Sequence, residues 1–354
     1  MDGSGALRGD WVDAEAAHRS IEPTLTFAYD RSQPGFEQVM AYWHLDRVQD
    51  RLQSLGFTDA NARPQPVLVN GSSADNAWFD PSTGVITTGT GGVDDAEDAD
   101  VLVHEYAHAL QDAITAGWGD GPDAAAFGEG FADYLAASVA DTASNQLGDP
   151  ACVAEWDGAA FAVPCIRRVD GSAHWPEDWD DGALADPHAN GEVWSAALWS
   201  ARAGLGADLT DSLALEALYG LPADPSTEAV AAALLDTAEA LYDTATRDVV
   251  RRALIAHGLS REISDPSVLS SPAYDLSLNI ASPHPGGSYA AHADLVATIH
   301  EPGAAALSVR FRGYDTEPED FVYVTNGDGD LYHVLTGRGV VGFTTAVIPG
   351  DTVH

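Results

Sequence analysis

Residues 99–133 read ADVLVHEYAHALQDAITAGWGDGPDAAAFGEGFAD, and this stretch decides the fold. Its first half has a long helical pattern that carries His104, Glu105 and His108 as an HExxH motif. Residues i and i+4 share one helical face, so both imidazoles can reach one metal ion. Glu105 projects towards a water molecule in the ion's open position. The motif therefore predicts a catalytic zinc site, and the alternative is a helix with two surface histidines.

A catalytic zinc ion needs a third protein ligand. Glu129 begins the next predicted helix, 129–139, and a helix–turn–helix return would bring it back to the histidines. Asp133 lies one helical turn further on the same face, where it can accept the outer N–H of a zinc-bound imidazole. Taken alone, Glu129 could equally be a surface acid. The joint pattern favours a ligand.

Short strands and a helix are predicted before the motif. Residues 36–55 have an amphipathic helical pattern that ends at Gly56. PVLVN at 66–70 is typical of a strand, and NAWFDPSTGVITTG at 76–89 is typical of two short strands around a turn. The NAWF strand resembles a sheet edge, which could pair with an extended peptide.

Acidic residues are dense where the motif helix begins. Clustered carboxylates suit calcium, but a solvated acidic face that caps the helix is the favoured interpretation. These acids are Asp94, Asp95, Asp98 and Asp100.

The pattern divides the chain into four parts. We expect an irregular lead-in at 1–35, a catalytic domain at 36–265, a linker at 266–277 and an all-β sandwich module at 278–354. Within the catalytic domain, further helices are predicted at 192–203, 227–242 and about 247–257. In the module, NGDGD at 326–330 predicts a hairpin. The module ends where another strand is expected, so we expect it to be truncated.

Composition excludes several classes of partner. Hydrophobic residues make up 45% of the 354 residues, enough for a core. All 16 basic residues are Arg, against 55 acids, giving a net charge of −39. Such a surface repels nucleic acid and anionic lipid, and no apolar run is long enough to span a membrane. Adaptation to high salt and composition bias explain the acidity equally well.

Cys152 and Cys165 are the only two cysteines. An even count at short spacing predicts one local disulfide and an oxidising compartment. The alternative is a pair of buried free thiols.

These motifs resemble a known group. H-E-x-x-H followed by E-G-x-x-D is similar to the gluzincin metalloproteases, the relatives of thermolysin and fungalysin. HEYAH, FGEGFADYLA and HANGEVWSAALW (188–199) are closest to the fungalysin pattern. The resemblance covers roughly residues 36–259 and implies an α+β fold, with a mixed sheet, an edge strand, an active-site helix and a helical C-terminal half. Residues 278–354 resemble a CUB-like module through SPHP, DFVYVTNGDGDLYHVLTG and FTTAVIPGDTVH.

The resemblance implies a role for each matching residue. His104, His108 and Glu129 would bind zinc, and Asp133 would be the acceptor behind the ligands. Glu105 would act as general base and later as proton donor.

The resemblance also implies how substrate is held. Asn76 and Ala77 would bind the substrate backbone from the edge strand. His188 would stabilise the oxyanion, unless it only caps the next helix. No Tyr lies between His108 and Glu129, so a tyrosine for the oxyanion is unassigned.

The expected function is that of a secreted zinc endopeptidase acting on peptides or proteins. One alternative is a vestigial metalloprotease that serves as a protein- or glycan-binding protein. Another is a zinc hydrolase of non-peptide amides or esters. We expect the C-terminal module to bind protein or glycan.

Overall fold

The computed structural model forms two units, Met1–Ser260 (unit 1) and Arg261–His354 (unit 2), which are described separately here. In unit 1 it describes residues 1–119, 121–142, 148–182 and 184–260. In unit 2 it describes residues 298–300, 302, 304, 306–307, 309–311, 314–315, 321–329, 331–336, 338–339, 343–345 and 348–354. The predicted linker, 266–277, and the start of the predicted module at 278 lie outside these residues.

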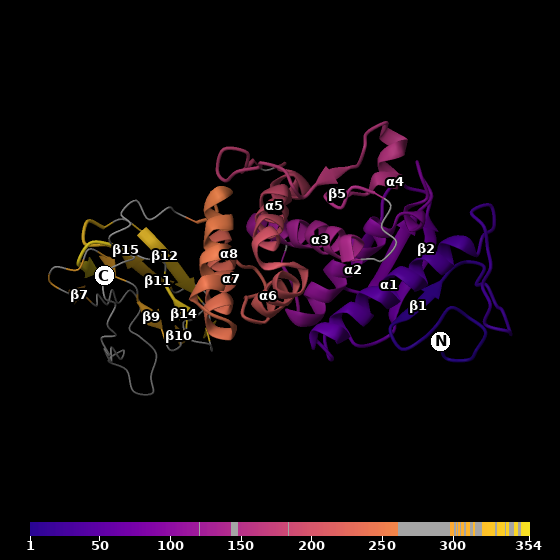
Figure 1. Cartoon of the computed structure of the whole chain (residues 1–354), viewed down its shortest axis with the longest axis horizontal. Helices are drawn as coiled ribbons and strands as arrows, with labels where there is room; N and C mark the ends of the chain where they lie inside the picture. Colours follow the sequence, from indigo (N-terminus) through magenta and orange to yellow (C-terminus); the bar gives the residue numbers. More distant parts are fainter. Residues whose placement is uncertain are drawn as a thin grey trace. The chain divides into compact units, whose positions relative to one another are not determined.

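The first half of unit 1 contains a four-stranded mixed sheet beside helix α1 (Figure 1). The strand order is β1 (Val12–Glu15), β2 (Gln65–Ser72), β4 (Val85–Gly89) and β3 (Trp78–Asp80). The β1–β2 and β2–β4 pairs are parallel, and β3 runs antiparallel to β4. The strand predicted at NAWF is thus an edge of this sheet.

The prediction of an irregular lead-in is wrong for β1. Val12 and Ala14 are fully buried, and β1 pairs in register with Gln65–Leu68. A strand of 4 residues offers too few positions for hydrophobic alternation to stand out. Its stability comes from pairing with β2, which is remote in the sequence.

Helix α1 (Phe36–Leu55) has the predicted bounds. Gly56 ends it with a φ of 99°, and its backbone N–H donates to the carbonyls of the last turn. The apolar face of α1 contributes to the main core, which continues through the helices that follow. Its buried apolar residues are Ala41, Leu45, Val48 and Leu52.

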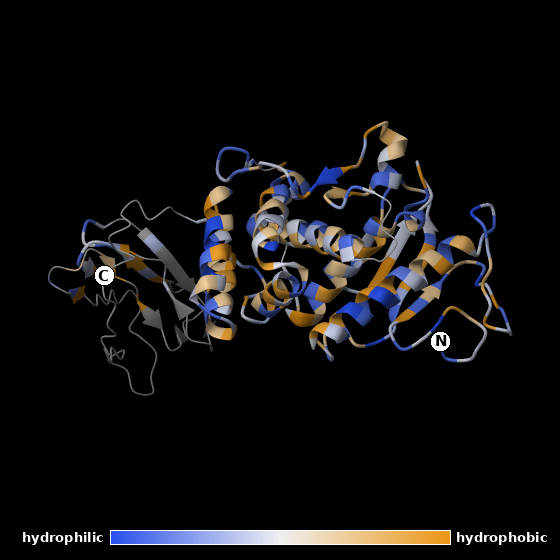
Figure 2. Cartoon of the chain, viewed as in Figure 1, coloured by the Kyte–Doolittle hydropathy of each residue, from blue (hydrophilic) through white to orange (hydrophobic). Residues whose placement is uncertain are grey.

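The second half of unit 1 is helical, which confirms the α+β class. Figure 2 shows that these helices carry both hydrophobic and hydrophilic residues, as expected where one face packs on a shared core. None of the described helices is long and apolar enough to cross a membrane. The helices are α2 (Ala99–Ile114), α3 (Pro122–Thr142), α5 (Pro187–Leu205), α6 (Ala207–Tyr219), α7 (Thr227–Leu241) and α8 (Thr244–Ala256).

Helix α6 is absent from the sequence predictions. Its Asp211 is 1% exposed, which a local hydrophobic pattern does not anticipate. The carboxylate accepts hydrogen bonds from Tyr134 Oη (2.8 Å) and Ser138 Oγ (2.7 Å) of α3. Arg51 Nη2 of α1 donates to its other oxygen at 2.7 Å. These partners compensate the burial of the charge.

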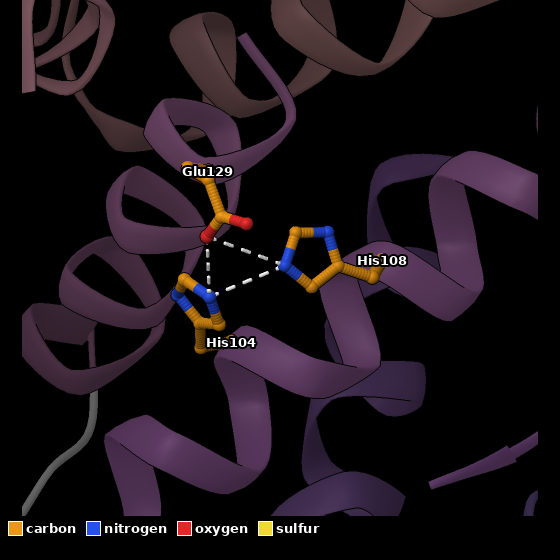
Figure 3. Close-up of side chains that lie close together, drawn as sticks. All are labelled: His104, His108 and Glu129. Atoms are coloured by element: carbon orange, nitrogen blue, oxygen red, sulfur yellow. Dashed lines mark hydrogen bonds and ion pairs between the residues drawn. The ribbon is translucent and has the colours of Figure 1, made fainter. Parts of the chain in front are cut away.

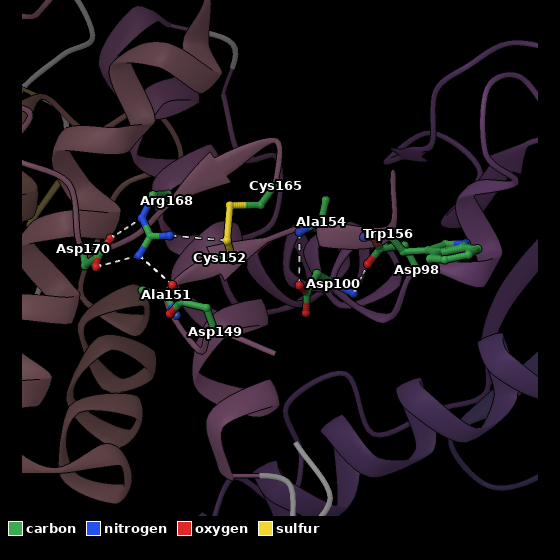
Figure 4. Close-up of a disulfide and its surroundings, with 10 residues drawn as sticks. All are labelled: Asp98, Asp100, Asp149, Ala151, Cys152, Ala154, Trp156, Cys165, Arg168 and Asp170. Carbon is green, nitrogen blue, oxygen red and sulfur yellow. Dashed lines mark hydrogen bonds and ion pairs between the residues drawn. A yellow bond between two sulfur atoms is a disulfide. The ribbon is translucent and has the colours of Figure 1, made fainter. Parts of the chain in front are cut away.

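The segment between α3 and α5 is joined by the predicted disulfide, Cys152–Cys165 (Figure 4). Strand β5 (Cys152–Val153) pairs antiparallel with β6 (Arg167–Arg168). Helix α4 (Glu155–Gly158) and the 3-10 helix η2 (Ala159–Phe161) lie within the disulfide loop. The disulfide therefore closes the segment that leads into Arg167.

The described part of unit 2 is all β. The hairpin predicted at NGDGD joins β11 (Phe321–Thr325) to β12 (Leu331–Thr336). A small apolar cluster contains Val324, Ile348 and Val353. The remaining short strands are β7 (Ile299–His300), β8 (Ala306–Leu307), β9 (Arg310–Phe311), β10 (Tyr314–Asp315), β13 (Arg338–Gly339), β14 (Phe343–Thr344), β15 (Ile348–Pro349) and β16 (Thr352–Val353).

Candidate active site and metal centre

Two packed helices bring the predicted metal ligands together. Asp98 caps α2 by accepting the Asp100 backbone N–H, and the helix then presents its two histidines one turn apart. The Nε2 atoms of His104 and His108 are 3.2 Å apart. Glu129 of α3 places Oε2 3.0 Å from His104 Nε2 and 3.6 Å from His108 Nε2 (Figure 3).

These three atoms have the spacing that one tetrahedral zinc ion requires. With metal bonds of about 2.0–2.2 Å, neighbouring ligand atoms lie roughly 3.3 Å apart. Glu129 Oε2 is buried, and the polar groups around it are imidazole nitrogens: those of His104 and His108, and His188 Nε2 at 3.2 Å. Two imidazole nitrogens and one buried carboxylate oxygen therefore fit a zinc ion in chemistry as well as in spacing.

The charges around His104 favour a cation. Burial by itself lowers the pKa of His104, but the carboxylates of Asp133 and Glu129 raise that pKa to about 10. Burial likewise raises the pKa of Glu129, yet the two imidazoles hold it well below its ordinary value. Metal binding at such a site releases a proton, so metal affinity falls as the pH falls.

Asp133 connects the metal ligands to Arg167, a residue that the sequence predictions missed. Asp133 Oδ1 lies 2.9 Å from His104 Nδ1. Arg167 donates from Nε to Oδ2 at 2.6 Å and from Nη2 to Oδ1 at 2.7 Å. Burial raises the pKa of Asp133, but Arg167 and His104 outweigh it and lower the pKa to about 2. The ionised carboxylate can orient His104 with Nε2 directed at the metal position.

A signal for Arg167 does exist in the sequence. No Arg or Lys lies between Arg63 and Arg167. A buried acid such as Asp133 needs a counter-ion, and this acidic chain offers few candidates.

His188 lies at the same site, on the first turn of α5. Its Nε2 is 3.2 Å from Glu129 Oε2, and its ring is nearly parallel to that of His104, with 6.1 Å between ring centroids. Asp186, the N-cap of α5, accepts the His188 backbone N–H at 3.0 Å and lies 3.0 Å from His188 Nδ1. Asp186, rather than His188, therefore caps the N-terminus of α5, which was the alternative role predicted for His188.

The remaining predicted residues flank this centre. Glu105 follows His104 on α2 and is 7% exposed. Asn76 and Ala77 immediately precede β3 at the sheet edge, where Asn76 is exposed and Ala77 is half-buried. Helix α2 packs against β3, so the edge strand and the motif helix are neighbours.

The family model described as Fungalysin metallopeptidase (M36) matches residues 85–262, half of the chain. The chain belongs to the fungalysin family. It is therefore a metallopeptidase, and the resemblance seen in its motifs is confirmed.

The fold of this fungalysin recurs in a solved structure titled as the precursor of protealysin, a metalloproteinase from Serratia proteamaculans. The two chains share 18% sequence identity with a TM-score of 0.56. The match covers 73% of this chain and 89% of that one. No curated protein sequence matches this fungalysin significantly.

The acids that precede the motif helix of the fungalysin were predicted to be solvated, but three of them are buried. Asp95, Asp98 and Asp100 are buried, because their carboxylates bind backbone N–H groups. Asp98 Oδ2 accepts from Trp156 N, and Asp100 Oδ2 accepts from Ala154 N (Figure 4). Asp98 Oδ2 also accepts from Asp157 N. These bonds attach the disulfide loop to the start of α2.

Asp95 gives the fungalysin a pH-dependent stability. Burial is the main cause that raises the pKa of Asp95 to about 7. The hydrogen bond from Gly89 N lowers this pKa, and the neighbouring acids raise it further. Because the folded-state pKa exceeds the ordinary value of 3.8, the stabilising contribution of the Asp95 carboxyl is complete below about pH 4. It is lost as the pH rises through about 7.

We expect Asp95→Asn, which can still accept the Gly89 N–H at Oδ1, to raise the melting temperature at about pH 8 by a few degrees. At about pH 4 the variant and the wild type should melt together. Thermal unfolding followed by circular dichroism across this range tests the prediction. A constant offset at every pH would contradict it.

Two glycines allow α3 and α5 of the fungalysin to touch behind the metal centre. A Cβ on Gly130 would collide with the Gly191 carbonyl oxygen. A Cβ on Gly191 would lie 2.8 Å from Gly130 N and 2.9 Å from Glu129 Cβ. This backbone contact joins the helix that carries Glu129 to the helix that carries His188.

Proposed function

We propose that this chain is a zinc endopeptidase that acts outside the cell on peptides and proteins. The supporting observation is the convergence of the His104 and His108 Nε2 atoms on one buried carboxylate oxygen, Glu129 Oε2. His104, His108 and Glu129 would hold the ion, and Asp133 would orient His104. Zinc bound there supplies a Lewis acid that polarises the scissile carbonyl and acidifies the attacking water.

Glu105 performs the proton transfers in this proposal. Its carboxylate takes a proton from the attacking water and later delivers it to the nitrogen of the leaving amine. The burial of Glu105 shields these transfers from bulk solvent. One group can serve both steps because the first transfer leaves it protonated for the second.

His188 stabilises the negative charge that develops on the carbonyl oxygen. Asp186 lies at hydrogen-bond distance from Nδ1 and can accept the Nδ1–H hydrogen bond. Nε2, which faces the metal centre, then serves as the donor once it is protonated. This arrangement needs no tyrosine between α2 and α3.

Substrate alignment is assigned to the sheet edge. An extended peptide can pair with backbone groups at Asn76 and Ala77, next to β3. Unpaired backbone groups at a sheet edge accept such an added strand without rearrangement.

The extracellular assignment is supported by the disulfide, which persists in oxidising compartments. We assign residues 1–260 to the catalytic domain, because β1 completes its sheet and the predicted start at residue 36 would exclude that strand. We assign 266–277 to a linker and 278–354 to a CUB-like module for protein or glycan binding. The hairpin and the all-β character of the described part of unit 2 support a β module.

Metal analysis combined with substrate assays tests the proposed function. The expected result is one zinc ion per chain, hydrolysis of casein at internal bonds, loss of activity in a chelator and recovery on adding zinc. Ester hydrolysis without casein hydrolysis would support a non-peptide hydrolase. Failure to bind zinc would support a vestigial protease.

His188→Ala should lower kcat by about 10²–10³-fold with little change in KM, because it removes a donor used only in the transition state. The zinc content should stay at the wild-type level. Hydrolysis of an internally quenched peptide and metal analysis measure the two effects. Loss of zinc together with activity would make His188 a metal ligand instead.

A further inference from the structure

A second group of carboxylates lies where α1 meets the 3-10 helix η1 (Asp95–Glu97). We call Glu37, Asp94 and Glu97 the α1–η1 carboxylates. One oxygen from each residue lies within 4.8 Å of the other two. This group is separate in sequence and in membership from the proposed zinc ligands.

Glu37 is the unusual member of the α1–η1 carboxylates. It belongs to the first turn of α1 and is only 5% exposed. Its Oε2 is buried without a hydrogen-bond partner in the described residues. A buried carboxylate oxygen without a partner carries a free-energy penalty that a bound cation can offset.

The neighbouring groups leave this charge uncompensated. Arg31 donates from Nε to both oxygens of Glu97, at 2.8 and 2.7 Å, and Trp156 Nε1 donates to Glu97 Oε2 at 3.0 Å. Asp94 is the N-cap of η1, yet its side chain makes no capping hydrogen bond. One guanidinium against three carboxylates leaves two negative charges, which a divalent cation would neutralise.

Two of the three α1–η1 carboxylates, Asp94 and Glu97, border a surface cavity, whereas Glu37 does not line it. A surface cavity of about 420 Å³ is lined by Arg31, Ser32, Gly92, Val93, Asp94 and Glu97. Ca²⁺ binds 6–8 oxygens at about 2.3–2.6 Å, so opposite ligands are separated by roughly 4.6–5.2 Å. The cavity leaves space for the waters that would complete the coordination of Ca²⁺.

We propose that Glu37, Asp94 and Glu97 form a calcium site that ties α1 to the segment leading into the motif helix. Burial and the neighbouring carboxylates raise the pKa of Glu37, in keeping with a group that takes up a proton or a cation. The bound ion would stabilise the start of the chain's catalytic helix without contacting substrate.

Terbium luminescence tests this site directly, because Tb³⁺ replaces Ca²⁺ and the Trp156 indole contacts a proposed ligand. The protein is the full-length, zinc-loaded chain carrying Glu105→Gln to suppress self-digestion. We expect Tb³⁺ emission excited through tryptophan, displaced by Ca²⁺. Glu37→Gln should weaken Ca²⁺ binding at least tenfold, and Asp94→Asn should weaken it as well.

Asp75→Asn provides the matched control. Asp75 belongs to another carboxylate group, with Asp95 and Asp157, which also lies near Trp156 in the sequence. Emission that disappears in Asp75→Asn but persists in Glu37→Gln would overturn the proposal.

Stability separates ligation from a structural effect of the substitution. Ca²⁺ should raise the melting temperature of the parent and leave that of Glu37→Gln unchanged. In buffer without added Ca²⁺, zinc-loaded Glu37→Gln should melt at or above the temperature of the zinc-loaded parent, because a buried charge has been removed. An equal Ca²⁺-dependent increase in both proteins would reject the site.

Discussion

Replacing Glu105 by Gln should lower kcat by at least about 10³-fold while zinc stays bound. The substitution preserves size and hydrogen bonding but removes the group that accepts the water proton, and general-base catalysis contributes about 10²–10⁴-fold. His104 and His108 flank Glu105 on α2 and keep their positions in the variant. Cleavage of an internally quenched peptide gives kcat, and atomic absorption gives the zinc content.

Glu228→Gln is the matched control for Glu105→Gln. Glu228 is exposed in the first turn of α7, so this exchange should leave both kcat and zinc content at wild-type values. A Glu105→Gln enzyme that retains more than a tenth of the wild-type rate would refute the general-base role.

Asp133→Asn should have the largest effect on stability. Arg167 would lose its bidentate counter-ion, with only 17% of its side chain exposed. Removing one partner of such a buried pair costs about 3–5 kcal/mol. At roughly 2–4 °C per kcal/mol for a domain of this size, the melting temperature should fall by about 10 °C. Zinc affinity should fall about 10–100-fold, because His104 loses an ionised acceptor.

Asp141→Asn is the control for the loss of an ion pair on the same helix. Asp141 pairs with Arg202 at 2.6 Å, but 31% of its side chain is exposed, so we expect a cost of less than about 1 kcal/mol. Combining Asp133→Asn with Arg167→Met should recover part of the lost stability. Strictly additive effects would show that the two residues are not coupled.

The hydrophobic pattern and turn residues predicted correctly those elements whose own sequence carries both the apolar pattern and the terminating residue. Phe36–Leu55 carries both its apolar face and its terminating glycine, and it matches α1. The NGDGD turn likewise identified the β11–β12 hairpin. Strand β1 and helix α6 were missed because their stability depends on remote partners, β2 in one case and Arg51 in the other.

The metal ligands of the candidate site could be predicted, because their spacing along the chain forms a motif. His104, His108 and Glu129 lie on elements that a motif can place, and the structure brings them within 3.6 Å of one another. Arg167 and Asp186 were missed because their roles depend on where loops return in three dimensions. The buried state of Asp98 has the same cause, since its partners lie in the disulfide loop.

The close crossing at Gly130 and Gly191 has a consequence for how this scaffold can diverge. A methyl group at either position would wedge α3 from α5 and alter the separation between Glu129 and His188. Substitutions at exposed positions outside the crossing, such as residues 73–76, do not disturb this contact. Gly130 and Gly191 themselves tolerate no larger residue unless the two helices move apart.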